Sequence, residues 1–208
     1  NQWRVLDGRL AFSLDGVYYF SSQKVSCRQC QSQQMSTGET QYKHSAITPV
    51  IVAPGCAHVL PYVPEFIVPQ DGAEKQDCEV TAAKRWLERE GSTLRRYRAI
   101  LLGDDLYSKQ PLCTAVLATS CDFIFVCHRE AHPALYAVVD AADGLARLPT
   151  LSQRRWNGRH GEIWTYRYLN NVPLRGGEGA LPVNWCDLTL THEETGAILY
   201  RNEWITNM

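Results

Sequence analysis

The sequence predicts an α/β fold, with a mixed sheet flanked by helices and a β-rich segment after it. Three extended segments come first and helical and extended patterns then alternate, an order typical of a mixed sheet with helices on its faces. From about residue 147 the chain instead alternates aromatic, β-branched and polar residues between Gly-rich turns. We therefore expect two regions, residues 1–146 and residues 147–208.

Three segments rich in Val, Ile, Phe and Tyr predict a meander of antiparallel strands. The first, residues 9–22 (RLAFSLDGVYYFSS), carries Asp15 near its centre, and the second covers residues 40–55. The third, residues 56–72, contains several prolines and therefore suits the edge of a sheet. The polar residues between the first two segments predict a loop.

The hydrophobic period changes to that of a helix over residues 73–91, where Cys78, Ala82 and Trp86 recur every four positions. Gly91 is expected to end this helix. The elements expected next are a buried strand, a helix with Ser108 as its N-cap, a second buried strand and a third helix, over residues 97–103, 108–120, 121–127 and 128–144.

Composition excludes some classes of protein. The net charge of −1 argues against a free-standing DNA-binding domain, and no apolar stretch approaches the length of a membrane span. The polar start, NQWRVLDGRL, lacks the apolar core of a signal peptide, so we expect a cytoplasmic setting. The chain begins without Met, which suggests a piece of a longer protein.

Two predicted strands carry acids. Asp15 lies in the first strand, and Asp104 follows the apolar run of ILLGDDLY. If these strands are adjacent and parallel, the two carboxylates converge and repel each other, so that either one is protonated or both bind a cation. Oxygen ligands suit Mg²⁺ or Mn²⁺. The simpler interpretation is that Asp15 and Gly16 form a turn and that Asp104 and Asp105 cap the next helix.

The segment LAFSLDGVYY, followed by AILLGDDLYS, resembles the first two acids of DDE-type insertion-sequence transposases. Two further segments, PEFIVPQDGAEKQDCE and VPLRGGEGALPVNWCDLTL, also resemble one subgroup of that family, so the resemblance covers essentially the whole chain. It implies a ribonuclease H-like fold with Asp15 and Asp104 as catalytic metal ligands. Asp104, three positions before Tyr107, matches the second acid of the family, and Asp105 is its neighbour.

The same resemblance implies that residues 1–146 are the catalytic core and that residues 147–208 are a β-rich insertion between the second and third acids. The family's third acid is a Glu on a later helix, close to an Arg-Trp pair. No such helix is found here, and Glu203 in YRNEWITNM lies in an extended context. We therefore expect the chain to end before its third acid and to cleave DNA poorly by itself.

The implied function is metal-dependent DNA strand cleavage and strand transfer during transposition. The implied partner is double-stranded DNA at transposon ends, bound by a homodimer in association with the bacterial nucleoid. Two alternatives share part of this evidence: an inactive transposase remnant that only binds DNA, and an unrelated metal-dependent nuclease. A Cys-His hydrolase is an enzyme alternative of another class, although no cysteine here has a recognised local signature.

A basic and aromatic stretch in the β-rich region is the candidate DNA contact. Arg154, Arg155, Trp156 and Arg159 combine charges for phosphates with a ring for stacking on an unpaired base. The alternative is a solvated hairpin with the Trp on its inner face.

The chain has eight cysteines, and without an export signal we expect no disulfide network. Cys27 and Cys30 have the C-x-x-C spacing of a zinc site, but no second C-x-x-C follows. His44 and Cys78 are the nearest candidates for the remaining ligands of a structural Zn²⁺. The alternative is a loop with two free thiols.

Overall fold

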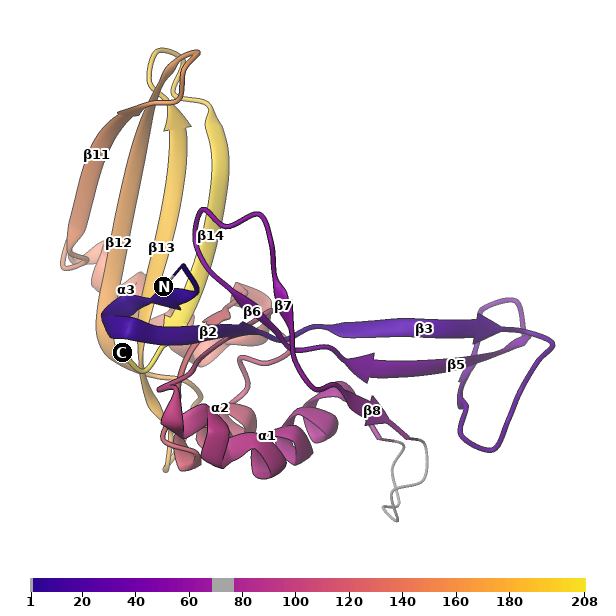
Figure 1. Ribbon diagram of the computed structural model, residues 1–208. Helices are drawn as coiled ribbons and strands as arrows, with labels where there is room; N and C mark the ends of the chain where they lie inside the picture. Colours follow the sequence, from indigo (N-terminus) through magenta and orange to yellow (C-terminus); the bar gives the residue numbers. More distant parts are fainter. Residues whose placement is uncertain (1, 69–76) are drawn as a thin grey trace. The chain divides into compact units, whose positions relative to one another are not determined.

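The computed structural model describes residues 2–68 and 77–208 and is α/β, as predicted (Figure 1). The chain divides into two compact units. Unit 1 comprises Asn1–Leu102 and Ala115–Cys121, and unit 2 comprises Gly103–Thr114 and Asp122–Met208. None of the helices in the described ranges is long and apolar enough to cross a membrane.

The first sheet of unit 1 is mixed. Its central strand is β2 (Arg9–Ser13), which pairs antiparallel with β1 (Arg4–Val5) and β6 (Val50–Val52) and parallel with β9 (Ile100–Gly103). Strand β7 (Leu60–Pro61) extends the sheet beyond β6. The parallel pair aligns the carboxyl ends of β2 and β9.

The second sheet of unit 1 is antiparallel. Strand β5 (Thr40–Ile47) pairs with β3 (Gly16–Ser22), β4 (Gln31–Gln34) and β8 (Glu65–Ile67). Figure 1 shows β3 and β5 running side by side as a long pair. The described part of the predicted third strand forms only β7 and β8, and residues 69–72 of that prediction lie outside the described residues.

The prediction of one continuous strand over residues 9–22 is wrong. Leu14 and Asp15 separate β2 from β3, and the chain passes there from one sheet to the other. The backbone N–H of Leu14 donates to Leu102 O at 2.9 Å, whereas Asp15 O accepts from Thr48 N at 2.9 Å. The second predicted strand is divided in the same way before Val50, where Pro49 has no N–H to donate.

Helix α1 (Glu79–Arg96) confirms the predicted amphipathic helix, but Gly91 does not end it. Gly91 is buried within the helix, and a Cβ there would lie 3.3 Å from Thr119 Cγ2. Close packing, rather than helix termination, therefore explains this glycine. Residues 73–76 of the predicted helix lie outside the described residues.

Aromatic side chains form the core between α1 and the first sheet. Trp86, on the buried face of α1, is fully buried and donates from Nε1 to Val63 O at 3.0 Å. The rings of Phe12 and Tyr62 lie 6.3 and 6.1 Å from the Trp86 ring, centroid to centroid. This packing fixes β2, the strand that leads to Asp15.

Unit 2 is built on an antiparallel series of strands. It contains β10 (Asp122–Val126) and four long strands, β11 (Thr150–Trp156), β12 (Gly161–Pro173), β13 (Pro182–His192) and β14 (Ile198–Thr206), which pair in order, with β14 also pairing with β10. Helix α3 (Pro133–Gly144) packs against β12. Short 3-10 turns occur at Leu6–Gly8 in unit 1 and at Arg129–Ala131 in unit 2.

Helix α2 (Gln110–Ala118) is divided between the two units and confirms the second predicted helix, with Pro111 in its first turn. Ser108 does not cap it, because its hydroxyl contacts Asp105 and His132 instead. The described helices and the longer strands thus follow the predicted order. The prediction of a loop between the first two segments is wrong in part, because β4 forms there by pairing with β5.

Candidate functional site

The two predicted metal-binding acids follow the carboxyl ends of a parallel strand pair. Strands β2 and β9 pair in parallel from Ala11 opposite Ile100 to Ser13 opposite Leu102. Asp15 follows β2, and Asp104 follows β9 directly. Asp15 belongs to unit 1 and Asp104 to unit 2, so that their convergence on one ion stays a prediction.

The side chains of Asp104 and Asp105 differ in their exposure and in their hydrogen-bond partners. Asp104 is exposed, and its Oδ1 accepts a hydrogen bond from Leu106 N at 2.9 Å. Asp105 is less exposed, and its Oδ1 accepts from His128 N at 2.7 Å and lies 3.3 Å from Ser108 Oγ. Asp105 therefore holds neighbouring segments of unit 2 together, and Asp104 is the acid of this pair that offers its carboxylate to solvent.

Glu79, which the sequence interpretation did not single out as a site residue, brings a second carboxylate to the Asp15 segment. It is the first residue of α1, and its side chain lies against Gly16. A Cβ at position 16 would be 2.2 Å from Glu79 Cδ and 2.4 Å from its Oε1. Gly16 therefore leaves the space that the Glu79 carboxylate occupies, next to exposed Asp15.

A buried group in unit 2 joins a serine, a histidine and an acid. Ser108 Oγ and His132 Nε2 are 2.6 Å apart, and Asp105 Oδ1 lies 3.6 Å from the same nitrogen. The serine is 0% exposed and the histidine 4%. In a catalytic triad the carboxylate contacts the other ring nitrogen, and the serine faces the substrate. This group therefore has the geometry of a structural hydrogen-bond cluster.

Three buried or half-buried cysteines do not have the properties of nucleophiles. Burial raises the pKa of Cys113 to about 12 and that of Cys127 to about 12. The pKa of Cys186 is raised to about 11, again by burial, with the nearby Asp187 charge adding to the effect. A nucleophilic cysteine needs a lowered pKa, so these three thiols do not support a Cys-His hydrolase.

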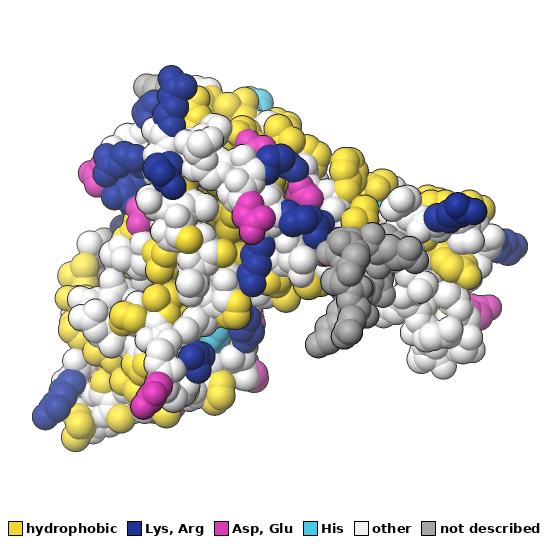
Figure 2. Space-filling view, turned by 90° about the horizontal axis from the view of Figure 1, so that it is seen from below, with side chains coloured by type: hydrophobic (Ala, Val, Ile, Leu, Met, Phe, Trp, Pro, Cys, Tyr) yellow, Lys and Arg dark blue, Asp and Glu magenta, His cyan; other side chains and the backbone are white. Residues whose placement is uncertain are grey.

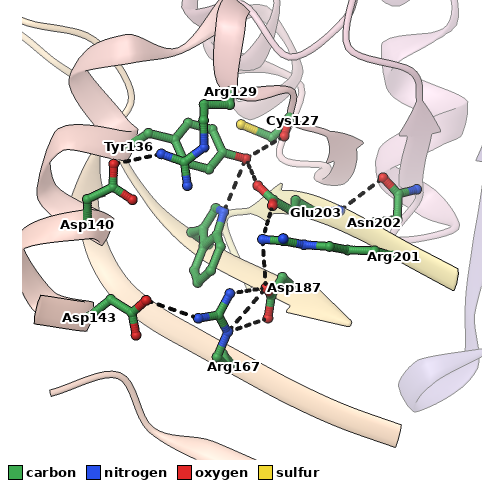
Figure 3. Close-up of polar contacts among 11 residues, drawn as sticks. Cys127, Arg129, Tyr136, Asp140, Asp143, Arg167, Asp187, Arg201, Asn202 and Glu203 are labelled. Carbon is green, nitrogen blue, oxygen red and sulfur yellow. Dashed lines mark hydrogen bonds and ion pairs between the residues drawn. The ribbon is translucent and has the colours of Figure 1, made fainter. Parts of the chain in front are cut away.

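A network of buried and half-buried polar groups ties α3 to β12, β13 and β14 (Figure 3). Tyr136 donates to the carboxylate of Glu203, which also accepts from Arg201 Nη2 at 2.9 Å. Asp187, whose side chain is fully buried, accepts from Arg167 Nη2 at 2.5 Å. Burial, followed by the hydrogen bond to Glu203, raises the pKa of Tyr136. Both acids are thus neutralised by arginines.

This network borders an open pocket of about 380 Å³. The pocket is lined by Cys127, His128, Arg129, Glu130, Arg201, Asn202 and Glu203. Arg129 pairs with Asp140 at 2.6 Å and lies 4.4 Å above the Tyr136 ring (Figure 3). Because its arginines already face acids, the pocket has a mixed rather than a positive charge. Glu203 lies in strand β14, in the extended context expected for it, and its carboxylate belongs to this network.

The predicted DNA contact residues lie together on the hairpin of β11 and β12. Every residue of β11 is exposed, and Trp156 is 70% exposed. Arg154 pairs with Glu193 at 2.6 Å, whereas the Arg155 guanidinium lies 4.3 Å above the Trp164 ring. Arg159 lies in the turn beside Gly158, whose φ of +94° favours glycine. The predicted set therefore forms one exposed end of the hairpin.

Basic side chains are dispersed on one face of the molecule. On the face shown in Figure 2, Lys and Arg lie singly or in small groups, with acidic side chains beside several of them. Arg167, in the same region of the sequence as the predicted DNA contacts, is held by Asp187 and Asp143. Any contact with a nucleic acid therefore depends on local groups such as the β11–β12 hairpin.

Three potential metal ligands converge in unit 1. One ligand atom each from Cys27, Cys30 and His44 lies within 4.8 Å of the other two. Cys78, the fourth ligand considered from the sequence, is not a member of this group; its Sγ lies 3.4 Å from Thr81 Oγ1 at the start of α1. Within the described residues, all eight cysteines are free, as predicted.

No protein-family model matches this sequence, and no curated protein matches it either. The function of the chain therefore has to be inferred from its own residues and their geometry.

Proposed function

We propose that this chain carries the ribonuclease H-like catalytic core of a DDE-type DNA transposase, with residues 147–208 as its β-rich insertion. The reaction is metal-dependent attack of water, or of a DNA 3′-hydroxyl, on a phosphodiester. Its partner is double-stranded DNA at transposon ends, engaged by a homodimer in the bacterial cytoplasm. Asp15 and Asp104 are the proposed metal ligands.

The observation that carries this proposal is the parallel pairing of β2 and β9 with an acid after each strand. In α/β sheets, functional side chains gather beyond the carboxyl ends of parallel strands. The order of β2, β6, α1, β9, α2 and β10, with β6 antiparallel to β2, is also the order expected for this fold.

The donor set fits a hard divalent cation. Asp15 and Asp104 are exposed carboxylates, and Mg²⁺ and Mn²⁺ prefer oxygen ligands. Glu79 is an additional candidate, because its carboxylate lies against Gly16, the residue after Asp15. When bound, the metal ion would stabilise the charge that develops on the attacking and leaving oxygens. Asp15 and Asp104 would hold the ion, and Gly16 leaves the space that the Glu79 carboxylate occupies.

Manganese binding to the 208-residue chain tests this assignment. Asp15→Asn and Asp104→Asn should each weaken Mn²⁺ binding at least about tenfold, as measured from the electron paramagnetic resonance of free Mn²⁺. Glu79→Gln should also weaken Mn²⁺ binding. Gly16→Ala should do the same, because the added methyl group displaces the Glu79 carboxylate. Asp7→Asn is the matched control, since Asp7 is an exposed acid in the same unit. Equal losses in Asp7→Asn, or unchanged binding in Asp15→Asn, would contradict the proposal.

The exposed end of the β11–β12 hairpin supplies the proposed DNA contact. Arg154→Ala should lower the slope of the logarithm of the binding constant against the logarithm of salt concentration by about 1, because one phosphate contact is lost. Trp156→Ala should cost about 1–3 kcal/mol if the ring stacks on an unpaired base. Arg96→Ala, which removes an exposed arginine of α1, is the control.

The two experiments together separate the alternatives. DNA binding without Mn²⁺ binding would favour an inactive remnant that only binds DNA. Mn²⁺ binding with no role for Arg154 and Trp156 would favour a metal-dependent nuclease of another kind.

A further inference from the structure

We propose that Cys27, Cys30 and His44 bind one zinc ion that fastens the loop between β3 and β4 onto β5. The proposal is independent of the DNA chemistry proposed above. It rests on the distances among three ligand atoms, on the backbone that positions them, and on the soft donor set of two sulfurs and one imidazole nitrogen.

The three ligand atoms have the separations of a tetrahedral zinc site. Bond lengths of about 2.3 Å to sulfur and about 2.0 Å to nitrogen imply separations of about 3.8 Å between two sulfurs and about 3.5 Å between sulfur and nitrogen. In the structure the sulfurs of Cys27 and Cys30 are 3.7 Å apart. His44 Nε2 lies 3.3 Å from the Cys27 sulfur and 3.4 Å from the Cys30 sulfur.

Strand register places His44 beside the second cysteine. Strand β5 pairs with β4 from Thr40 opposite Gln34 to Lys43 opposite Gln31. Cys30 precedes Gln31 and His44 follows Lys43, so that the antiparallel ladder leads both toward the same position. The residues that follow Cys30 and His44 are also joined to each other, because Ser45 Oγ donates to Gln31 Oε1 at 2.6 Å in the protein interior.

The loop backbone adopts a conformation suited to thiolate ligands. The N–H of Gln29 points to the Cys27 sulfur at 3.3 Å, and the N–H of Cys27 points to the Cys30 sulfur at 3.2 Å. Donors of this kind stabilise negative charge on sulfur and orient the ligands, as second-shell groups do in metal sites. The carbonyl of Cys27 also accepts from Cys30 N at 3.1 Å, which closes the turn.

Aromatic rings fix the imidazole. The Tyr19 ring stacks on the His44 ring with a centroid separation of 5.7 Å, and the Phe20 ring lies 5.4 Å away. Both residues belong to β3, the strand on the other side of β5 from β4. The third ligand is therefore held in place from the side opposite the cysteine loop.

A zinc site explains the arrangement better than a disulfide or redox pair. A disulfide needs its sulfurs at about 2.05 Å, and a dithiol pair has no need of an imidazole nitrogen close to both sulfurs. Two thiolates and a neutral imidazole also balance the charge of Zn²⁺. The fourth coordination position falls to a ligand such as water, as in zinc sites with three protein ligands.

Metal analysis of the 208-residue chain, purified without chelator, tests the proposal. We expect about one zinc per chain by inductively coupled plasma mass spectrometry, and a loss of at least about tenfold in Cys27→Ser and in His44→Asn. Cys78→Ser and His58→Asn are matched controls, because they remove an exposed cysteine and an exposed histidine of the same unit. Both controls should retain the metal.

A second measurement covers variants that fail to fold. Wild-type protein stripped of metal and titrated with Co²⁺ should show thiolate-to-cobalt charge-transfer absorption and tetrahedral d–d bands, and stoichiometric Zn²⁺ should abolish both. Absence of these bands, absence of bound zinc in the wild type, or an equal loss of zinc in Cys78→Ser would overturn the proposal.

Discussion

Two histidines of this protein, His44 and His132, each lie close to two polar side chains through one ring nitrogen, but these partners differ in their chemistry. His44, in unit 1, meets two sulfurs through one ring nitrogen, and Cys27, one of those two cysteines, is exposed. His132, in unit 2, meets a serine hydroxyl and an aspartate through one ring nitrogen, in the protein interior. The contacts around the two rings are alike in number, but the chemistry of the partners and their access to solvent are not.

The difference shows how a ligand set is distinguished from a hydrogen-bond cluster. Around His44 the neighbours are soft donors at the separations that a tetrahedral ion imposes. Around His132 a hydroxyl at 2.6 Å satisfies the nitrogen directly, and the backbone of Leu174 bonds the ring as well. The first arrangement gains from a metal ion, whereas the second is complete without one.

The largest expected contrast is in thiol reactivity. Cys113 Sγ contacts Ser108 O at 3.5 Å, beside His132, and burial raises the pKa of Cys113 to about 12 from 9.0. At pH 8 this lowers the thiolate fraction about 1000-fold, and alkylation by iodoacetamide should slow at least as much. Peptide mass spectrometry measures the rate, with exposed Cys78 as the internal reference. Labelling of Cys113 as fast as Cys78 would reopen the case for a cysteine nucleophile.

The second contrast is in stability. His132→Ala should destabilise the protein by about 3 kcal/mol, because it opens a cavity and removes the imidazole that hydrogen-bonds to the buried Ser108 hydroxyl. In metal-free protein, His44→Ala should cost about 1 kcal/mol or less, since its side chain is only half-buried. Urea unfolding in the presence of a chelator compares the two. Equal losses would mean that His44 also has a structural role without metal.

The third contrast concerns the metal itself. Free Zn²⁺ at about 100 times its dissociation constant should stabilise the region that binds it by about 2.7 kcal/mol. Amide hydrogen exchange in β4 and β5 should therefore be about 100-fold slower with zinc than without it. The strands of unit 2 should exchange at the same rate with and without zinc. Zinc-dependent protection that persists in His44→Asn would place the metal elsewhere.

The sequence was informative where a local pattern decides the structure. The period of Cys78, Ala82 and Trp86 predicted the buried face of α1, and the apolar run before Asp104 predicted β9. The break at Asp15 was anticipated only by the alternative of a turn at Asp15 and Gly16, because its form depends on which of two sheets each half of the segment joins. Gly91 misled for a similar reason, since its role depends on contact with Thr119, far away in the sequence.

The candidate sites were predictable only in part. The C-x-x-C spacing pointed to Cys27 and Cys30, and His44 and Cys78 were both considered as further ligands. Only His44 lies beside the two cysteines, because the register of β4 and β5 places it there, and no local pattern reveals that register. Glu79 was not singled out from the sequence, because its contact with Gly16 joins residues that are far apart along the chain. The pairing of Glu203 with Tyr136 requires the position of α3 beside β14, whereas Arg201 lies two residues before Glu203 on the same strand.

The smallest expected contrast is a pH dependence confined to His132. Burial is the main cause that lowers the pKa of His132 from 6.5, and the nearby Lys109 charge lowers it further, although Asp105 acts in the opposite direction. The ring is therefore neutral in the folded protein at pH 7, and its contact with Asp105 is not an ion pair. Below pH 6.5 the unfolded chain takes up a proton that the folded chain resists, so acid favours unfolding.

Stability from this group is therefore complete above pH 6.5 and falls as the pH drops below it, by at most about 1.4 kcal/mol per pH unit. Unfolding free energies at pH 7.5 and pH 5.5 should differ more in the wild type than in His132→Gln, which keeps a polar side chain and cannot titrate. Taking the difference between the two proteins removes the contribution of all other groups. If the wild type lost no more stability than His132→Gln on acidification, the histidine would have to be protonated in the fold, and its contact with Asp105 would be an ion pair after all.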